Sequence, residues 1–306
     1  MSSQIPVSFV DQFSRNVFHL SQQKGSKLRG SVRTETQNAE SAFYDRIGTV
    51  AAQLKTGRHS DTPQLDTPHT RRMVTLNDYE WADLIDKEDK IKTINDPTND
   101  YLMAAMWAMG RSMDDVILAS MGADAYGGQK GATAVALPDT QRFACNNGAA
   151  FTNLNVSSLR RLARMFDDQE VEGKRFIACA PSQIESMLGQ TEATSSDYNT
   201  VKALVQGEIN SFMGFEFIKT TRLGTFGAVN ASPTAGTVGA GSSVSGFRKC
   251  YAWVKEGVML AVGSEVKARV GERADKSYSN QVYASMSIGG TRLEEVKVIE
   301  FAAKET

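Results

Sequence analysis

The feature that most constrains this chain is a long helical pattern between residues 96 and 121. Asp96 is a suitable N-cap, Pro97 suits the first helical position, and Gly122 can end the helix. A helix of about 25 residues is ~37 Å long, well above the globular average. The sequence therefore predicts a structural spine. Its apolar side chains recur every three or four residues, at Leu102, Met106, Met109, Met113, Val116 and Ile117.

The segment before residue 35 is polar and basic, with Asp11 as its only acid. Apolar residues at three- and four-residue steps between Val10 and Leu20 predict a short amphipathic helix, followed by an extended basic stretch. Two interpretations stay open: an arm that docks on a neighbouring subunit and faces nucleic acid, or a packed helix with a solvated charge run. The basic residues concerned are Arg15, Lys24, Lys27, Arg29 and Arg33.

Residues 35–75 predict a projecting hairpin. Apolar residues near 43–54 can line a helix or a strand, and a polar stretch with Pro63 and Pro68 follows them. A long polar excursion inside a compact domain is usually functional or mobile. Such a projection can bury its apolar face only against another copy of the chain. Residues 77–92, with a possible cap at Asn77 or Asp78, predict a helix with a charged outer face.

From residue 150 the pattern becomes mixed α and β, which predicts a subdomain built on a central sheet. The low-complexity residues 224–246 predict an exposed loop. Helices are expected at 156–168, 181–188 and 198–212, and strands at 175–180, 215–219, 249–254, 258–262, 265–270, 282–287 and 296–301.

The sequence offers little for catalysis or metal binding. The three histidines, His19, His59 and His69, lie in the arm or the polar loop, where rigid preorganisation is difficult. The widely spaced Cys145, Cys179 and Cys250 indicate small buried thiols. The acidic pairs at 114–115 and 167–168 indicate solvated helix faces, because adjacent helical residues point apart. We therefore expect a protein that is no enzyme and uses no cofactor or metal.

Charge and hydropathy exclude further classes. Lys plus Arg total 34 and Asp plus Glu total 35, a formal net charge of −1, which argues against a dedicated nucleic-acid binder. No run approaches the ~20 apolar residues that span a bilayer, and the N-terminus lacks the pattern of a signal peptide. The sequence predicts a soluble protein made in the cytoplasm.

The order of these elements resembles the major capsid proteins of tailed bacteriophages, which have the Hong-Kong-97-type α+β fold. Residues 212–220 (FMGFEFIKT) and 252–262 (AWVKEGVMLAV) also look like this family. The resemblance implies an N-terminal arm at 1–34, an E-loop at 35–72 and a P domain at 73–149 that contains the spine helix. It also implies an A domain at 150–270, and P-domain return strands with the C-terminus at 271–306.

The resemblance further implies a shell protein that forms hexamers and pentamers and encloses double-stranded DNA in a virion. Expected partners are a separate scaffolding protein, a portal protein and a cementing protein, with non-specific DNA contact by the five basic arm residues. Lys55 is the sole candidate for the crosslink that some members form, and we do not expect that crosslink. Alternatives left open are an encapsulin-like nanocompartment shell, an α/β enzyme with a pocket, and a fibre subunit.

Overall fold

The computed structural model describes residues 21–55, 57–58, 62, 64–86, 98–147, 150–190, 211–226 and 246–305. The chain divides into two compact units. The small unit consists of Met1–Ser26, Asp78–Ser112 and Ser264–Ser287, and the large unit of Lys27–Asn77, Met113–Gly263 and Ile288–Thr306. Each unit is therefore assembled from segments that are far apart in the sequence.

The predicted spine is confirmed as helix α2, Thr98–Gly122, whose 25 residues end at the glycine expected to stop it. Its buried side chains recur every four residues. The buried stripe is therefore rotated slightly around the helix relative to the predicted stripe. Met106, expected on that stripe, is 41% exposed. Asp96 and Pro97 lie outside the described residues. The buried positions on this step are Ala105, Met109, Met113, Ile117 and Met121, and Gly110, Asp114 and Leu118 beside them are also buried.

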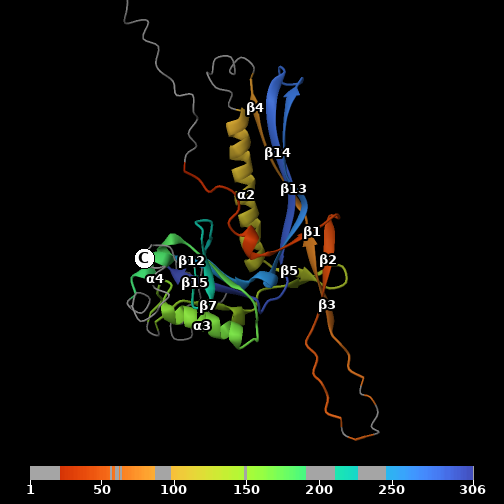
Figure 1. Cartoon of the computed structure of the whole chain (residues 1–306), viewed down its shortest axis with the longest axis vertical. Coiled ribbons are helices and arrows are strands. Elements are labelled where there is room, and N and C mark those ends of the chain that lie inside the picture. Colours follow the sequence, from red (N-terminus) through yellow and green to blue (C-terminus); the bar gives the residue numbers. More distant parts are fainter. Residues whose placement is uncertain are drawn as a thin grey trace, which may run out of the picture. The chain divides into compact units, whose positions relative to one another are not determined.

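A seven-stranded sheet forms the centre of the large unit (Figure 1). β8 and β10 are parallel, whereas β12 runs antiparallel to both β8 and β15. The strand order is β7 (Arg142–Ala144), β15 (Val298–Lys304), β12 (Phe247–Val254), β8 (Arg175–Cys179), β10 (Phe215–Lys219) and β9 (Ser211–Phe212), and β11 (Thr225–Phe226) pairs with β12.

Two helices of the large unit follow the predicted bounds. In α3 (Val156–Asp167) the side chains of Leu159, Leu162 and Phe166 are fully buried, and the Phe166 ring lies 6.2 Å from that of Phe215 in the sheet. The Asn155 side chain caps α3 by accepting a hydrogen bond from the backbone N–H of Ser158, 2.7 Å away. α4 (Pro181–Leu188) begins at its proline, as expected.

The predicted hairpin is confirmed in the large unit. β2 (Ser41–Ile47) and β3 (His69–Thr75) pair antiparallel from Ser41↔Thr75 to Ile47↔His69. β5 (Ala125–Gly127) and β6 (Thr133–Val135) complete a four-stranded sheet in the order β2, β3, β5, β6. The described loop residues, 48–55 and 64–68, reach away from these strands (Figure 1).

A third sheet has the order β1 (Arg33–Thr36), β13 (Val258–Arg273), β14 (Ser279–Arg292) and β4 (Asn77–Ile85). β1 runs parallel to the start of β13, from Arg33↔Met259 to Thr36↔Val262. The strands expected at 258–262 and 265–270 are one continuous strand, β13. Three short 3₁₀ turns complete the described elements, at Arg29–Ser31, Asp139–Gln141 and Lys255–Gly257.

The helix predicted at 77–92 is wrong, because residues 77–85 form strand β4. Tyr79 and Trp81 are half-buried and alternate with the exposed Asp78 and Glu80, which is the two-residue period of a strand. Pairing with β14 decides the outcome, since strand preference depends on such neighbours. Hydroxyl groups of β14 donate to carboxylates on or beside β4: Ser287 to Asp78, Tyr283 to Glu80 and Ser279 to Asp86.

The helix predicted at 198–212 is wrong at its end, where Ser211–Phe212 form β9 against β10. Its remaining residues lie outside the described part of the chain. The loop predicted at 224–246 is corrected at Thr225–Phe226, which form β11, and residues 227–245 are not among those described. Residues 10–20, expected to form a helix, also lie outside it.

A buried arginine closes the end of α2. Arg292 is fully buried, and its guanidinium donates 2.9 Å hydrogen bonds to the carbonyl groups of Met121, Ala123 and Val135. Carbonyl groups at a helix C-terminus lack helical partners, and a cation is favourable there. Burial lowers the pKa of Arg292, but an arginine remains charged at neutral pH.

We predict that Arg292→Met lowers the free energy of unfolding by about 3–5 kcal/mol, because it leaves buried carbonyl groups without donors. Urea unfolding of purified subunits would measure the change. The matched control is Arg269→Met, because Arg269 is exposed and its loss removes no buried contact. Equal stability of the two variants would contradict the capping role.

Candidate assembly surfaces

The β2–β3 hairpin and its loop expose large apolar side chains. Ile47 is 70% exposed and Leu54 is 91% exposed. Both residues belong to the segment that contains the paired strands β2 and β3 and the described part of their loop. An exposed apolar surface of this kind marks an interaction site. The other members are Phe43, Val50 and Leu65.

The two faces of the hairpin differ because side chains alternate along a strand. Tyr44 and Arg72 are paired in register and lie on the inner face, together with Val74. Val74 packs in a buried cluster with Met259 and Ala261, and Tyr44 packs against that cluster. The outer face carries Phe43, Asp45, Ile47, His69 and Arg71, all of which are exposed.

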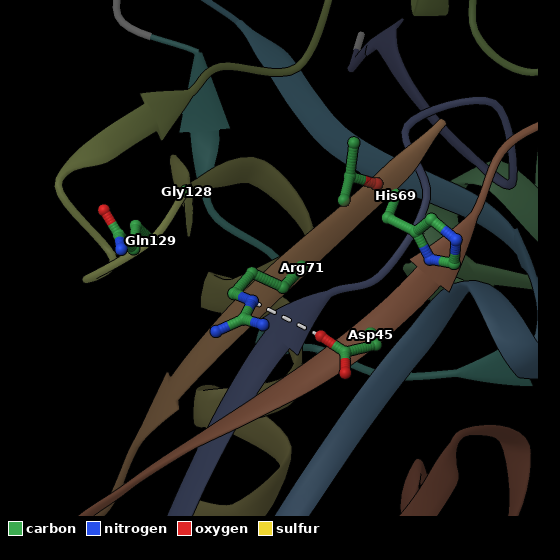
Figure 2. Close-up of a pocket in the computed structure, with 6 residues that line it drawn as sticks. Asp45, His69, Arg71, Gly128 and Gln129 are labelled. Carbon is green, nitrogen blue, oxygen red and sulfur yellow. Dashed lines mark ion pairs between the residues drawn. The ribbon is translucent and has the colours of Figure 1, made fainter. Parts of the chain in front are cut away.

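A shallow pocket of ≈ 500 Å³ lies on this outer face (Figure 2). The Asp45 carboxylate is 3.3 Å from Nε of Arg71, whose guanidinium also lies 5.6 Å from the centre of the Phe43 ring. Asp45 is thus committed to an ion pair rather than to His69. The described residues of the pocket show no arrangement of nucleophile and base, and we interpret it as part of a contact surface. Its lining residues are Asp45, His69, Thr70, Arg71, Gly128 and Gln129.

Glu295 anchors the base of the hairpin. Arg72 is 3% exposed and forms an ion pair with Glu295, and Nη1 of Arg46 lies 3.6 Å from the same carboxylate. Arg46 also donates to the carbonyl of Leu293. Burial lowers the pKa of Arg72, and the attraction of Glu295 acts against that change. One carboxylate therefore ties both hairpin strands to the segment that precedes β15.

We predict that Glu295→Gln destabilises the large unit by about 3 kcal/mol, because Arg72 keeps its charge but loses the partner that compensates its burial. Thermal unfolding would measure the effect. Glu294→Gln is the control, since the described residues give Glu294 one ion pair, with Lys297 three residues away, and this partly exposed pair contributes little. A similar small loss in both variants would argue against the anchor.

The base of the N-terminal arm is held by helix α2. In the large unit, the fully buried Asp114 carboxylate accepts hydrogen bonds of 3.0–3.1 Å from the backbone N–H groups of Lys27 and Leu28. Leu28 is itself fully buried, and the indole of Trp253 donates to the carbonyl of Ser31 at 2.9 Å. In the small unit, Arg111 donates to the Gln22 side chain and to the carbonyl of Gln23.

A glycine in α2 allows the arm to pass close to the helix within the small unit. A Cβ atom at Gly110 would lie 2.5 Å from the backbone of Gly25, closer than real contacts allow. Glycine inside a helix costs roughly 0.5–1 kcal/mol relative to alanine. The close passage of the arm is the structural reason for this glycine.

The structure places four of the five predicted basic residues, and Arg15 lies outside the described chain. Lys24 lies 5.3 Å from the centre of the Trp107 ring, and the ammonium of Lys27 donates to the carbonyl of Lys219 at 3.0 Å. Arg33 pairs with Glu35 at 2.8 Å, and Arg29 also has a partner. These residues are thus spread along the arm base, each with a contact inside the chain. Lys55 is exposed on the hairpin loop.

The prediction of two solvated acids at 114–115 is wrong for Asp114 and confirmed for Asp115. The Asp115 side chain is 46% exposed and pairs with Arg222. Asp114 faces the arm, and its role depends on a segment 87 residues earlier in the sequence. The only sequence signal was its place on the edge of the apolar stripe, next to Met113. The acids at 167–168 are exposed, as expected.

We predict that Asp114→Asn loosens the arm base, because a neutral amide oxygen is a weaker acceptor than a carboxylate for the two N–H groups. Tryptic cleavage after Lys24, Lys27 or Arg29 should become about tenfold faster, since a loss of ~1.4 kcal/mol is a factor of ten in the open population. Asp115→Asn is the control and should leave the cleavage rate within about twofold of the unchanged chain. Equal cleavage rates in the two variants would contradict the anchoring role.

The described residues hold no group of three His, Cys, Asp or Glu side chains that could bind a metal ion. The cysteines are confirmed as free, buried thiols. Among the described helices, none is long and apolar enough to cross a membrane.

Comparisons with known proteins agree with this architecture. The sequence model of a family described as phage capsid protein matches residues 5–305. No curated protein matches the chain. Among solved structures, the capsid of Cyanophage P-SCSP1u has a TM-score of 0.75 at 15% identity, and the match covers 100% of this chain and 96% of the other.

Two further capsids show the same fold. The capsid of Ralstonia phage GP4 has a TM-score of 0.73 at 12% identity and covers 98% of this chain and 96% of its own. The capsid of a native GTA particle has a TM-score of 0.70 at 12% identity and covers 100% of both chains. The encapsulin alternative gains no support, because the matching family is that of phage capsids. Since this family matches nearly the whole sequence, the chain belongs to the phage capsid protein family and is a major capsid protein.

Proposed function

We propose that this capsid protein assembles into hexamers and pentamers, which join into an icosahedral head that encloses a double-stranded DNA genome. The observation that carries the proposal is the apolar surface of the β2–β3 hairpin, which the subunit alone leaves uncovered. In the assembled shell this hairpin, the predicted E-loop, lies over a neighbouring subunit. Each subunit then buries several surfaces, and a standard protein contact alone covers ~1,600 Å².

Each predicted region has its own role in the proposed assembly. These regions are the arm, the E-loop, the P domain and the A domain. The hairpin and the arm contact neighbours, and the sheet of the large unit contributes to contacts around each capsomer. The proposed partners are a scaffolding protein during assembly, a portal protein, and a cementing protein on the finished shell. The subunits are made in the cytoplasm of the bacterial host.

The proposed DNA contact depends on the arm. Arg15, Lys24, Lys27, Arg29 and Arg33 would attract phosphate groups without sequence preference. The internal contacts of Lys24, Lys27 and Arg33 compete with phosphate groups for these side chains. Non-specific binding of this kind falls steeply with salt, which offers a direct measurement on shells that have packaged DNA.

We predict that Leu54→Asp abolishes shell formation, because it places a charge in a surface that a neighbouring subunit must desolvate. The variant subunit should unfold at the temperature of the unchanged chain, since Leu54 is 91% exposed. Electron microscopy of the protein expressed with and without a scaffolding protein would measure the yield of shells. Discrete small oligomers of the unchanged chain under every condition would contradict the proposed function.

Lys55→Ser is the matched control, because it changes the adjacent exposed residue without adding a charge to the apolar surface. We expect normal shells from this variant. We also expect unchanged shells to dissociate to single chains in denaturing gels, since Lys55 forms no crosslink. Covalent ladders that disappear in Lys55→Ser would overturn that expectation.

A further inference from the structure

A second pocket, of ≈ 380 Å³, lies at the start of α3 in the large unit, far from the hairpin in the sequence. Five of the seven described residues that line it are polar, and among these seven Arg161 alone is charged. Amide and hydroxyl groups surround that charge, and the Ser157 hydroxyl already donates to Asn155 at 2.8 Å, so Arg161 is the main donor for an oxygen ligand. The polar lining residues are Asn146, Asn147, Ser157, Ser158 and Arg161.

The Arg161 guanidinium is fixed but not neutralised. It lies 4.8 Å from the centre of the Phe143 ring, which in turn stacks on Phe301 with ring centres 5.8 Å apart. Among the described residues, no carboxylate forms an ion pair with Arg161, whereas Arg164 one turn later pairs with Asp168 at 3.2 Å. A half-buried guanidinium of this kind favours a carboxylate ligand.

The surroundings of Arg161 leave its charge uncompensated. Burial lowers the pKa of Arg161, the Cys145 thiol acts in the opposite direction, and Arg164 adds to the lowering. The thiol cannot supply a negative charge at neutral pH, because burial raises the pKa of Cys145 to about 12. An acid from outside the subunit would therefore be stabilised here.

The turn after α3 carries two acids that form no ion pair with any described residue. Asp167 forms an ion pair with Arg175, and Asp168 forms one with Arg164. Glu170 and Glu172 are exposed, and neither forms an ion pair with any residue that the structure describes. The turn that presents them is well defined, because Glu170 and Val171 donate 3.0 Å backbone hydrogen bonds to Asp167 and Phe166. Val171, between the two glutamates, is buried and holds the turn in place.

We propose that the Arg161 pocket of one copy binds the acidic turn, Glu170 and Glu172, of the next copy. The inference rests on the proposed self-assembly and names one contact within it. The acidic turn follows the end of α3, and Arg161 lies six residues before that end, about 9 Å along the helix axis at 1.5 Å per residue. A contact between two different patches is heterologous and closes into a ring when the rotation between copies allows it.

Charge reversal tests this contact. Arg161→Glu alone, and Glu170→Arg with Glu172→Arg, should each lower the yield of shells about tenfold or more, because each places like charges together. Combining all three substitutions in one chain should restore the yield to within about threefold of the unchanged protein, because the pair is then reversed and not removed. Electron microscopy and sedimentation of full-length protein, assembled under one condition, would measure the yields.

Two controls separate the contact from a loss of folding. Arg160→Glu changes the neighbouring exposed arginine, which does not line the pocket, and should assemble normally. The thermal unfolding temperature of each unassembled variant should match that of the unchanged chain. The milder Arg161→Gln should lower the yield less than Arg161→Glu does.

The outcomes distinguish this contact from the proposed function. Normal shell yield from Arg161→Glu, or a triple variant no better than the single reversals, would overturn the contact while the proposed function stands. Absence of shells from the unchanged chain, with and without a scaffold, would overturn both. Loss in each reversal and recovery in the combination would support the pairing of the pocket with the acidic turn.

Discussion

Two buried charges on or beside helix α2 hold the centre of the large unit together. Asp114 binds the arm through the N–H groups of Lys27 and Leu28, and Arg292 binds the carbonyl groups at the helix end. Apolar packing alone could let a helix rotate or slide against its neighbours. A buried charge that loses its partner is costly, so these two residues fix where the arm and strand β14 meet the helix.

That fixed frame explains why the hairpin can leave apolar residues uncovered. Its inner face is anchored through Arg72 to Glu295 and through Val74 to the core, whereas the described residues of its outer face and loop have no buried anchor of that kind. The exposed apolar surface lowers the solubility of a free subunit, and association with other copies buries that surface. The stability of the shell therefore depends on surface that the single chain cannot bury.

The elements that the sequence predicted correctly are those whose residues interact locally. The four-turn apolar stripe of α2, the Asn155 cap of α3 and the proline of α4 act over a few residues. β4 was mistaken for a helix because its form depends on β14, about 200 residues later, whose hydroxyl groups bind the acids beside Tyr79 and Trp81. Asp114 was mistaken for a solvated acid for the same reason: its partners lie in the arm. The pocket at Arg161 could not be predicted from the sequence either, because Phe143 and α3 come together only in the folded chain.

Because the formal net charge is only −1, individual ion pairs and apolar surfaces matter more for association than the overall charge does. Because the chain is nearly neutral, its copies do not repel one another over long range. Neutralising the overall charge would therefore add little to the stability of a large assembly. Several surface ions are already paired inside the subunit, as Arg222 is with Asp115 and Arg248 with Glu305. Apolar surfaces such as the hairpin supply attraction with little directional preference. Arg161 in the middle of α3, and Glu170 and Glu172 in the turn after it, form no ion pair with any described residue, and in the proposed contact they determine which orientation of two copies is favoured.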